Sequence, residues 1–268
     1  MKSEFEFIAE LKARTLTGTF PDLITGIGDD AAVVASSVDR EWLITSDLLV
    51  EDTHFSLDFT SADRLGYKAL AVNLSDIAAM GGQPKFFLLN IATPKKYTGQ
   101  FLRDFSDGIL TFAKQQNVQL IGGDTSSSKD KLFISITLIG ECKRGKAVRR
   151  NSAQAGDLVY ITGSLGGSAL GLQLLKSGLR LAESGTLLPL ANDLFASFNS
   201  RDTRNKLAAI KAHLLPIPRV ELGRVIGERG LASAMIDISD GLSSDLIHIC
   251  HDSNVGVEVF VDKLPIAP

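Results

Sequence analysis

The hydrophobic residues of this chain follow two periodicities that alternate along its first half. Continuous apolar runs at residues 42–46, 86–92, 118–121 and 132–140 are typical of buried strands. Two longer segments between these runs repeat apolar residues at steps of three and four, which predicts helices. The two stripes consist of Leu65, Ala69, Val72 and Asp76 in the first helix, over about 61–80, and of Phe101, Phe105, Ile109 and Phe112 in the second. Strands and helices therefore alternate, which predicts an α/β or α+β fold.

The second half of the chain continues this alternation. Apolar patterns predict strands at residues 158–162, 234–238 and 255–261, whereas residues 184–206 predict irregular structure. Three helices are also expected. They cover residues 166–177, a segment that begins at Pro218, and a segment after Gly241.

Length and composition indicate a globular protein of two domains. The chain has 268 residues, of which 44% are hydrophobic and 22% charged, and this composition is ordinary for a folded protein. A basic, polar segment at residues 143–157 interrupts the pattern of buried elements. We therefore predict an N-terminal domain at residues 1–148 and a C-terminal α/β domain at residues 149–268.

Charge and hydropathy exclude several classes of partner. The net charge of −3 and the absence of a dense basic run argue against nucleic acid as a partner. No apolar run approaches the roughly 20 residues that a membrane span needs, and the first residues do not resemble a secretory signal. We therefore expect a cytoplasmic protein without a membrane partner. The two cysteines, Cys142 and Cys250, form no metal-binding motif.

Carboxylates at positions where burial is expected are the main chemical signal. Asp47 ends an apolar strand, Asp76 lies on the apolar stripe of a helix, Asp124 follows a strand and two glycines, and Asp237 lies within an apolar run. Any one of them can be a turn or capping residue. Together they predict a site for Mg²⁺, because a buried carboxylate needs a partner and Mg²⁺ prefers oxygen ligands. The full set of suspect acids is Asp29, Asp30, Asp47, Glu51, Asp52, Asp76, Asp124, Asp237 and Asp240.

Glycine-rich turns near these acids are compatible with a phosphate ligand. For Gly122-Gly123-Asp124, close approach to a phosphate and plain turn geometry are equally good explanations. Neither a P-loop motif nor a dinucleotide-binding motif in its strand-to-helix context is present. His54 follows an acid cluster and is a candidate substrate contact, whereas the other histidines lack supporting metal ligands.

Five motifs, taken together, resemble the thiamine-monophosphate kinase family. They are GIGDDAAVV, TSDLLVEDTHF, NLSDIAAMGG, IGGDTS and MIDISDGLSSDL, and they extend the resemblance from about residue 20 to about residue 250. The resemblance implies the two-domain fold of the aminoimidazole ribonucleotide synthetase and selenophosphate synthetase superfamily. It also implies a homodimer formed through the sheet of the N-terminal domain.

The resemblance also implies roles for individual residues. The Mg²⁺ ligands would be Asp30, Asp47, Asp76, Asp124, Asp237 and Asp240, with an oxygen from Thr45 or Ser46. Nucleotide contacts would come from Gly123, Asp124, Arg150 and Ser239, and His54 would contact the substrate. Asp29, Glu51, Asp52 and Asp245 are second choices.

The implied reaction moves the γ-phosphoryl group of ATP onto thiamine monophosphate to give thiamine diphosphate. The acceptor phosphate is already anionic at neutral pH, so neither a general base nor a covalent nucleophile is expected among the residues. The GEDYELLF-like segment and final aromatic residue of the family are not found in this sequence, so we expect a truncated C-terminal domain. Two alternatives stay open: another ATP-using synthetase of the superfamily, and a non-catalytic dimer that binds nucleotide or metal.

Overall fold

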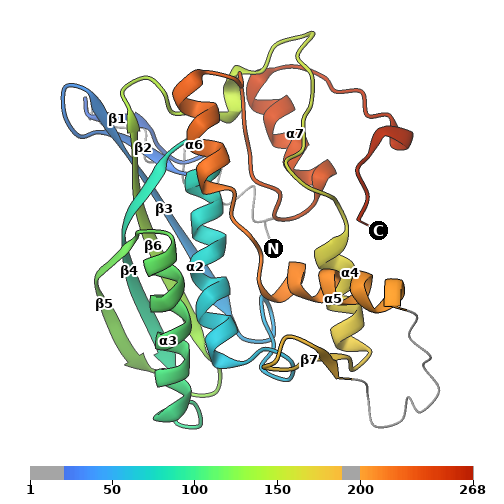
Figure 1. The fold of residues 1–268 in the computed structure, drawn as a ribbon. Helices are drawn as coiled ribbons and strands as arrows, with labels where there is room; N and C mark the ends of the chain where they lie inside the picture. The colour runs from blue at the N-terminus through green and yellow to red at the C-terminus, as the bar shows by residue number, and fades with distance from the viewer. Residues whose placement is uncertain (1–20, 189–199, 268) are drawn as a thin grey trace.

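A six-stranded mixed sheet forms one side of the molecule, for which a computed structural model describes residues 21–188 and 200–267 (Figure 1). The strand order is β1-β2-β3-β6-β4-β5. The strands are β1 (Leu23–Thr25), β2 (Ala32–Ala35), β3 (Arg40–Val50), β4 (Gln83–Thr93), β5 (Gln119–Ser127) and β6 (Phe133–Lys143). All neighbouring strands are antiparallel except β4 and β5, which run parallel.

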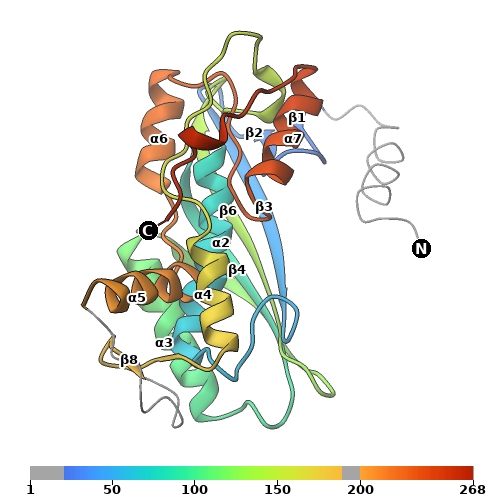
Figure 2. The ribbon, with the colours of Figure 1, turned by 90° about the vertical axis from the view of Figure 1, so that its right-hand side faces the viewer.

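Two long helices, α2 (Ala62–Ala79) and α3 (Gln100–Gln115), pack together on one face of this sheet (Figure 2). Alternate residues of β6, Ile134, Ile136 and Leu138, are fully buried in the core that these helices cover. Leu65 and Ala69 of α2 are also fully buried, as the helical stripe predicted. The resulting core fixes α2 against the middle of the sheet, and α2 carries Asp76.

The remaining elements follow the sheet in sequence. They are η1 (Arg150–Ser152), α4 (Gly167–Lys176), β7 (Arg180–Leu181), β8 (Leu187–Leu188), α5 (Ser200–Leu214), α6 (Val220–Arg229), α7 (Leu242–Ser253) and η2 (Val261–Lys263). The helices α4 and α5 enclose a second, smaller hydrophobic cluster that includes Leu175, Ile210 and Leu214. The described part of the chain therefore has two separate hydrophobic clusters.

The backbone of helix α6 lies so close to the end of α2 that no side chain fits between them at the points of contact. A Cβ atom added at Gly223 would lie 2.1 Å from the carbonyl oxygen of Ala78, and one at Gly227 would lie 2.7 Å from that of Gly81. Both separations are shorter than a carbon–oxygen contact permits, so glycine is required at both positions. The chain that follows the sheet is thus joined to the end of α2 by direct backbone contact.

The structure confirms the strands and helices predicted for the first half, and also α4, α6 and α7. The strands predicted at residues 158–162, 234–238 and 255–261 are wrong, because none of these segments pairs in a ladder with another described strand. The apolar side chains of the first and third segments are largely exposed, with Tyr160 83% and Val261 80% exposed, whereas those of residues 234–236 are partly buried. An apolar, β-branched sequence forms a strand only where a neighbouring strand accepts its hydrogen bonds.

Residues 200–206, predicted to be irregular, belong to α5, and that prediction is also wrong. Residues 189–199 of the same segment lie outside the described residues, as do residues 1–20 and 268. The division at residues 148 and 149 stays a prediction. Among residues 21–188 and 200–267, no helix has both the length and the hydrophobicity that a membrane crossing would require.

Candidate metal and phosphate site

Three aspartates from distant parts of the sequence meet at the end of α2. Carboxylate oxygens of Asp30, Asp76 and Asp237 all lie within 4.8 Å of one another. Asp30 belongs to the turn before β2, Asp76 to the last turn of α2, and Asp237 to the segment before α7. Two oxygens on opposite sides of one Mg²⁺ ion lie about 4 Å apart, so this spacing suits a shared cation. We call Asp30, Asp76 and Asp237 the aspartate cluster.

Hydrogen bonds between β3 and α2 hold one side of the aspartate cluster. The hydroxyl of Thr45 donates to Asp76 at 2.5 Å, and the backbone N–H of Asp47 donates to the side-chain oxygen of Asn73 at 3.2 Å. Asn73 is fully buried, and its amide nitrogen donates to the carbonyl of Ala69 at 3.0 Å. Thr45 and Asp47 therefore face α2 from the strand.

Burial raises the pKa values of these acids. Desolvation, followed by the charges of Asp47 and Asp237, raises the pKa of Asp76 to about 9. Desolvation also raises the pKa of Asp30 to about 7, although Arg150 opposes this shift. The pKa values of Asp47 and Asp237 are raised as well, in both cases mainly by desolvation. Without a metal ion, the site therefore retains protons that free aspartates would lose.

Arg150 is the cation that the chain itself places beside the aspartate cluster. Its guanidinium forms an ion pair and a short hydrogen bond with Asp30, whose side chain is only 2% exposed. Its backbone N–H donates to Asp29 at 3.3 Å, and Asp29 also accepts the N–H of Asp30 at 3.0 Å. Asp29 thus shapes the turn and holds η1, whereas Asp30 points into the cluster.

Asp245 organises the loop that carries Asp237. It is 4% exposed and accepts hydrogen bonds from the N–H groups of Ser239 at 2.9 Å and Gly241 at 3.1 Å. Its carboxylate is therefore engaged with the backbone. Two other second-choice acids also have protein partners: Glu51 accepts from Tyr97 and from the N–H of Leu132, both at 2.8 Å, and Asp52 pairs with Lys131.

Several predicted site residues lie outside the aspartate cluster. Asp124 is exposed on the edge strand β5, and its neighbour Gly123 is three strands from Asp47 along the ladder, a separation of about 14 Å. Ser46 follows Thr45 in β3 and bonds to Ile136 and Thr137 of β6. Asp240 and Ser239 are exposed in the loop before α7. The roles assigned to these residues stay predictions.

His54 lies in the turn that follows β3. Its Nδ1 atom accepts the N–H of Val50 at 3.0 Å, and the ring is close enough to Asp47 to oppose, in part, the rise in the pKa of that carboxyl that desolvation and Asp237 cause. The backbone oxygen of His54 lies 3.5 Å from the ammonium of Lys68. The predicted substrate contact therefore lies beside the acids, and its role also stays a prediction.

The sequence analysis missed three residues that support the site: Asn73, Ser75 and Lys68. Ser75 forms a side-chain hydrogen bond with Asp237 and so joins the two halves of the chain. Asn73 and Ser75 stand within NLSD, the motif of Asp76, and a buried Asn beside a metal-ligand candidate was a signal available from the sequence. Lys68 lies two helical turns before Asp76, which places it on the same side of α2.

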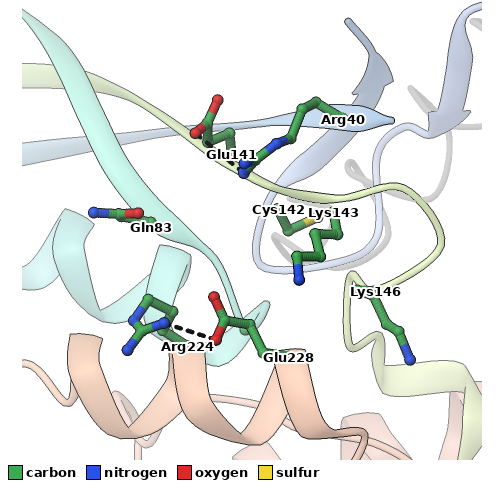
Figure 3. Close-up of a pocket in the computed structure, with 9 residues that line it drawn as sticks. Arg40, Gln83, Glu141, Cys142, Lys143, Lys146, Arg224 and Glu228 are labelled. Carbon is green, nitrogen blue, oxygen red and sulfur yellow. Dashed lines mark hydrogen bonds and ion pairs between the residues drawn. The ribbon is translucent and has the colours of Figure 1, made fainter. Parts of the chain in front are cut away.

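A separate polar pocket lies away from these residues, where the ends of β3 and β6 meet α6 (Figure 3). Arg40 pairs with Glu141 at 3.3 Å across this pocket, and Arg224 pairs with Glu228 at 2.7 Å. Its walls also include Lys143 and Lys146. Because most of its charged groups are paired with one another, it is a weaker candidate for a ligand site than the aspartate cluster.

Comparison with known proteins shows the family to which the chain belongs. Residues 28–142 match the family model described as AIR synthase related protein, N-terminal domain. Over 263 residues the chain is 40% identical to thiamine-monophosphate kinase of Bacillus subtilis strain 168, and the match covers 98% of this chain and 74% of the relative. The chain belongs to the thiamine-monophosphate kinase family.

Solved structures of the thiamine-monophosphate kinase family have the same fold. One, described as AaThiL complexed with AMPPCP and TMP, superposes with a TM-score of 0.80 at 31% identity and covers 98% of this chain and 74% of that one. Thiamine-monophosphate kinase from Stenotrophomonas maltophilia K279a gives a TM-score of 0.73 at 38% identity, with coverage of 98% and 76%. The predicted family and the predicted mixed α/β fold class are therefore confirmed.

Proposed function

We propose that this protein transfers the γ-phosphoryl group of ATP to the phosphate of thiamine monophosphate, in a reaction that requires Mg²⁺. The observation that carries the proposal is the aspartate cluster, assembled from three segments in a chain of this kinase family. The binding of AMPPCP and TMP by a related structure supports the same pair of substrates. The products would be thiamine diphosphate and ADP.

The donor set fits Mg²⁺. Asp30, Asp76 and Asp237 would hold the ion or ions, with Asp47 and Thr45 beside them and Ser46, Asp124 and Asp240 as further candidates. All three members of the cluster have raised pKa values, as expected for carboxylates that lack their cation. Bound Mg²⁺ would neutralise the phosphate oxygens and the charge that develops during transfer.

The reaction needs little proton chemistry from the protein. An oxygen of the acceptor phosphate forms a bond with the γ-phosphorus, and the bond from that phosphorus to the bridging oxygen of ADP breaks. The second pKa of a phosphate monoester is about 6, so the attacking oxygen is anionic at neutral pH. The task of the residues is therefore to align two polyanions, and Gly123, Asp124, Arg150 and Ser239 are the proposed nucleotide contacts.

We also propose a homodimer in which the sheet face opposite α2 and α3 meets a second copy. Large apolar side chains remain exposed on strands of this sheet, including Leu48 at 54% and Phe86 at 37%. Large apolar side chains exposed on one face of a sheet are typical of an interface. The dimer would function in the cytoplasm, where ATP is available. Its oligomeric state can be measured by sedimentation, with Phe86→Glu expected to give monomers.

The test of the proposed function is a ³¹P NMR time course with ATP, thiamine monophosphate and Mg²⁺. We expect thiamine diphosphate and ADP to appear together, and to be absent with EDTA or with thiamine alone. Free phosphate without thiamine diphosphate would indicate a nucleotide site without this acceptor. If no ATP is consumed with a panel of phosphorylated and amide acceptors, the protein is a non-catalytic binder and the proposal is wrong.

A further inference from the structure

Lys68 is a partly buried cation without an acidic partner among the described residues. Its ammonium forms one described hydrogen bond, to the backbone oxygen of His54 at 3.5 Å, which is a long contact. Within residues 21–188 and 200–267, no carboxylate forms an ion pair with it. Desolvation lowers the pKa of Lys68, and no neighbouring acid offsets this effect. A partly desolvated ammonium without a counter-ion is stabilised when an anion binds to it.

His213 is one group that lies close enough to Lys68 for the two charges to interact. His213 of α5 accepts or donates a hydrogen bond with Ser168 of α4 at 3.2 Å, and its ring meets that of Phe59 edge-on. Burial, together with the charges of Lys68 and Lys176, lowers the pKa of His213 to about 4. His213 is therefore neutral at neutral pH, and the two lysines give this region a positive potential.

The position of Lys68 relates it to the proposed reaction. It lies eight residues before Asp76 in α2, which corresponds to about 12 Å along the same side of the helix. The turn that it touches carries His54, the predicted substrate contact. One stretch of α2 thus presents a metal-binding carboxylate at one end and an unpaired ammonium at the other.

We propose that Lys68 binds the phosphate group of thiamine monophosphate and so orients the acceptor toward the aspartate cluster. This assignment rests on the proposed function. The dianionic phosphate supplies the counter-ion that Lys68 lacks, and its free oxygen can then face the nucleotide held at Asp30, Asp76 and Asp237. A charge-assisted hydrogen bond of this kind discriminates between thiamine monophosphate and thiamine, which has no phosphate.

The first experiment compares steady-state kinetics of Lys68→Met and Lys68→Arg. Lys114→Met, at an exposed lysine in the last turn of α3, is the matched control. We expect Lys68→Met to raise KM for thiamine monophosphate about 10- to 100-fold and to leave KM for ATP within about twofold of the wild type. Lys68→Arg retains the charge and should recover part of the loss. Equal increases in both KM values would instead indicate a structural role.

The second experiment does not depend on turnover. Acetic anhydride labels uncharged lysine amines, and mass spectrometry of peptides from the wild-type protein gives the rate at Lys68. We expect inorganic phosphate and thiamine monophosphate to slow labelling of Lys68 at least threefold relative to Lys114, and thiamine to have no effect.

The two experiments separate the failure of this assignment from the failure of the proposed function. If phosphate protects Lys68 from labelling but the protein makes no thiamine diphosphate, Lys68 is still an anion site and the proposed kinase reaction is wrong. Normal turnover with no protection of Lys68 and an unchanged KM in Lys68→Met would overturn the assignment alone. If Lys68→Met does not fold, Lys68→Arg and labelling of the wild type still decide the question.

Discussion

The acids of the site are held by two different kinds of structure. Asp76 belongs to an 18-residue helix packed on an 11-residue strand, with fully buried side chains such as Leu74 and Ile77 next to it. Asp237 belongs to a segment without regular secondary structure, positioned by single hydrogen bonds to Ser75 and by the loop around Asp245. One carboxylate is therefore fixed by a core and the other by a few polar contacts.

This difference indicates where the site can change shape. Opening a helix that is buried on a sheet exposes much apolar surface, and its free energy approaches that of global unfolding. Opening the loop around Asp237 breaks only a few hydrogen bonds, each with a net contribution of about 1 kcal/mol. We therefore expect the sheet side of the site to be rigid and the side of Asp237 to adjust when ligands bind.

The largest effect is expected from Asp76→Asn. Its carboxylate stands between β3 and the rest of the aspartate cluster, so loss of its charge should lower kcat by about 1,000-fold or more. Stability should be unchanged or higher in EDTA, because the wild-type carboxyl is already protonated at neutral pH. Turnover and thermal unfolding measure the two parts. Asp63→Asn, at an exposed acid in the first turn of α2, is the control, and near-normal turnover of Asp76→Asn would contradict the metal assignment.

A smaller effect is expected from Asp245→Ala, which removes the side chain that holds the loop around Asp237. The N–H groups of Ser239 and Gly241 lose their acceptor, which should lower the free energy of unfolding by about 1–3 kcal/mol. Hydrogen exchange of residues 237–241 should accelerate, while that of β3 and α2 stays slow. Ser244→Ala, at an exposed position of α7, should change neither quantity. Equal acceleration on both sides would show that the two regions open as one unit.

The smallest effect concerns pH in the absence of metal. The folded-state pKa values of Asp76 and Asp30, about 9 and about 7, exceed their ordinary value of 3.8. Between those values the folded state binds more protons than the unfolded state, so stability is highest near pH 4 and is lost as pH rises toward 9. Thermal unfolding in EDTA should show this decline for the wild type, and a weaker decline for Asp76→Asn. An equal decline in the variant and the wild type would mean that Asp76 is not the proton-binding group.

The sequence allowed accurate prediction of those helices and strands whose buried face is marked by the spacing of their own apolar residues. The stripe ending at Asp76 correctly predicted a helix, and the apolar run before Asp47 correctly predicted a strand. In the structure these two elements pack together. Pairing partners are not contained in such patterns, which is why residues 158–162 and 255–261 were wrongly predicted to be strands. The convergence of Asp237 with Asp30 depends on contacts more than 200 residues apart in sequence, and it was reached through the family resemblance.

The direct backbone contact between α6 and α2 has a mechanical consequence. With Gly223 against Ala78 and Gly227 against Gly81, neither helix can slide past the other without a collision of main-chain atoms. We therefore expect the two helices to move together as one rigid unit, and this unit carries the carboxylate of Asp76 near the end of α2. We therefore expect any movement of the loop that carries Asp237 to take place in the chain after Arg229, where α6 ends, while α6 and α2 keep their contact.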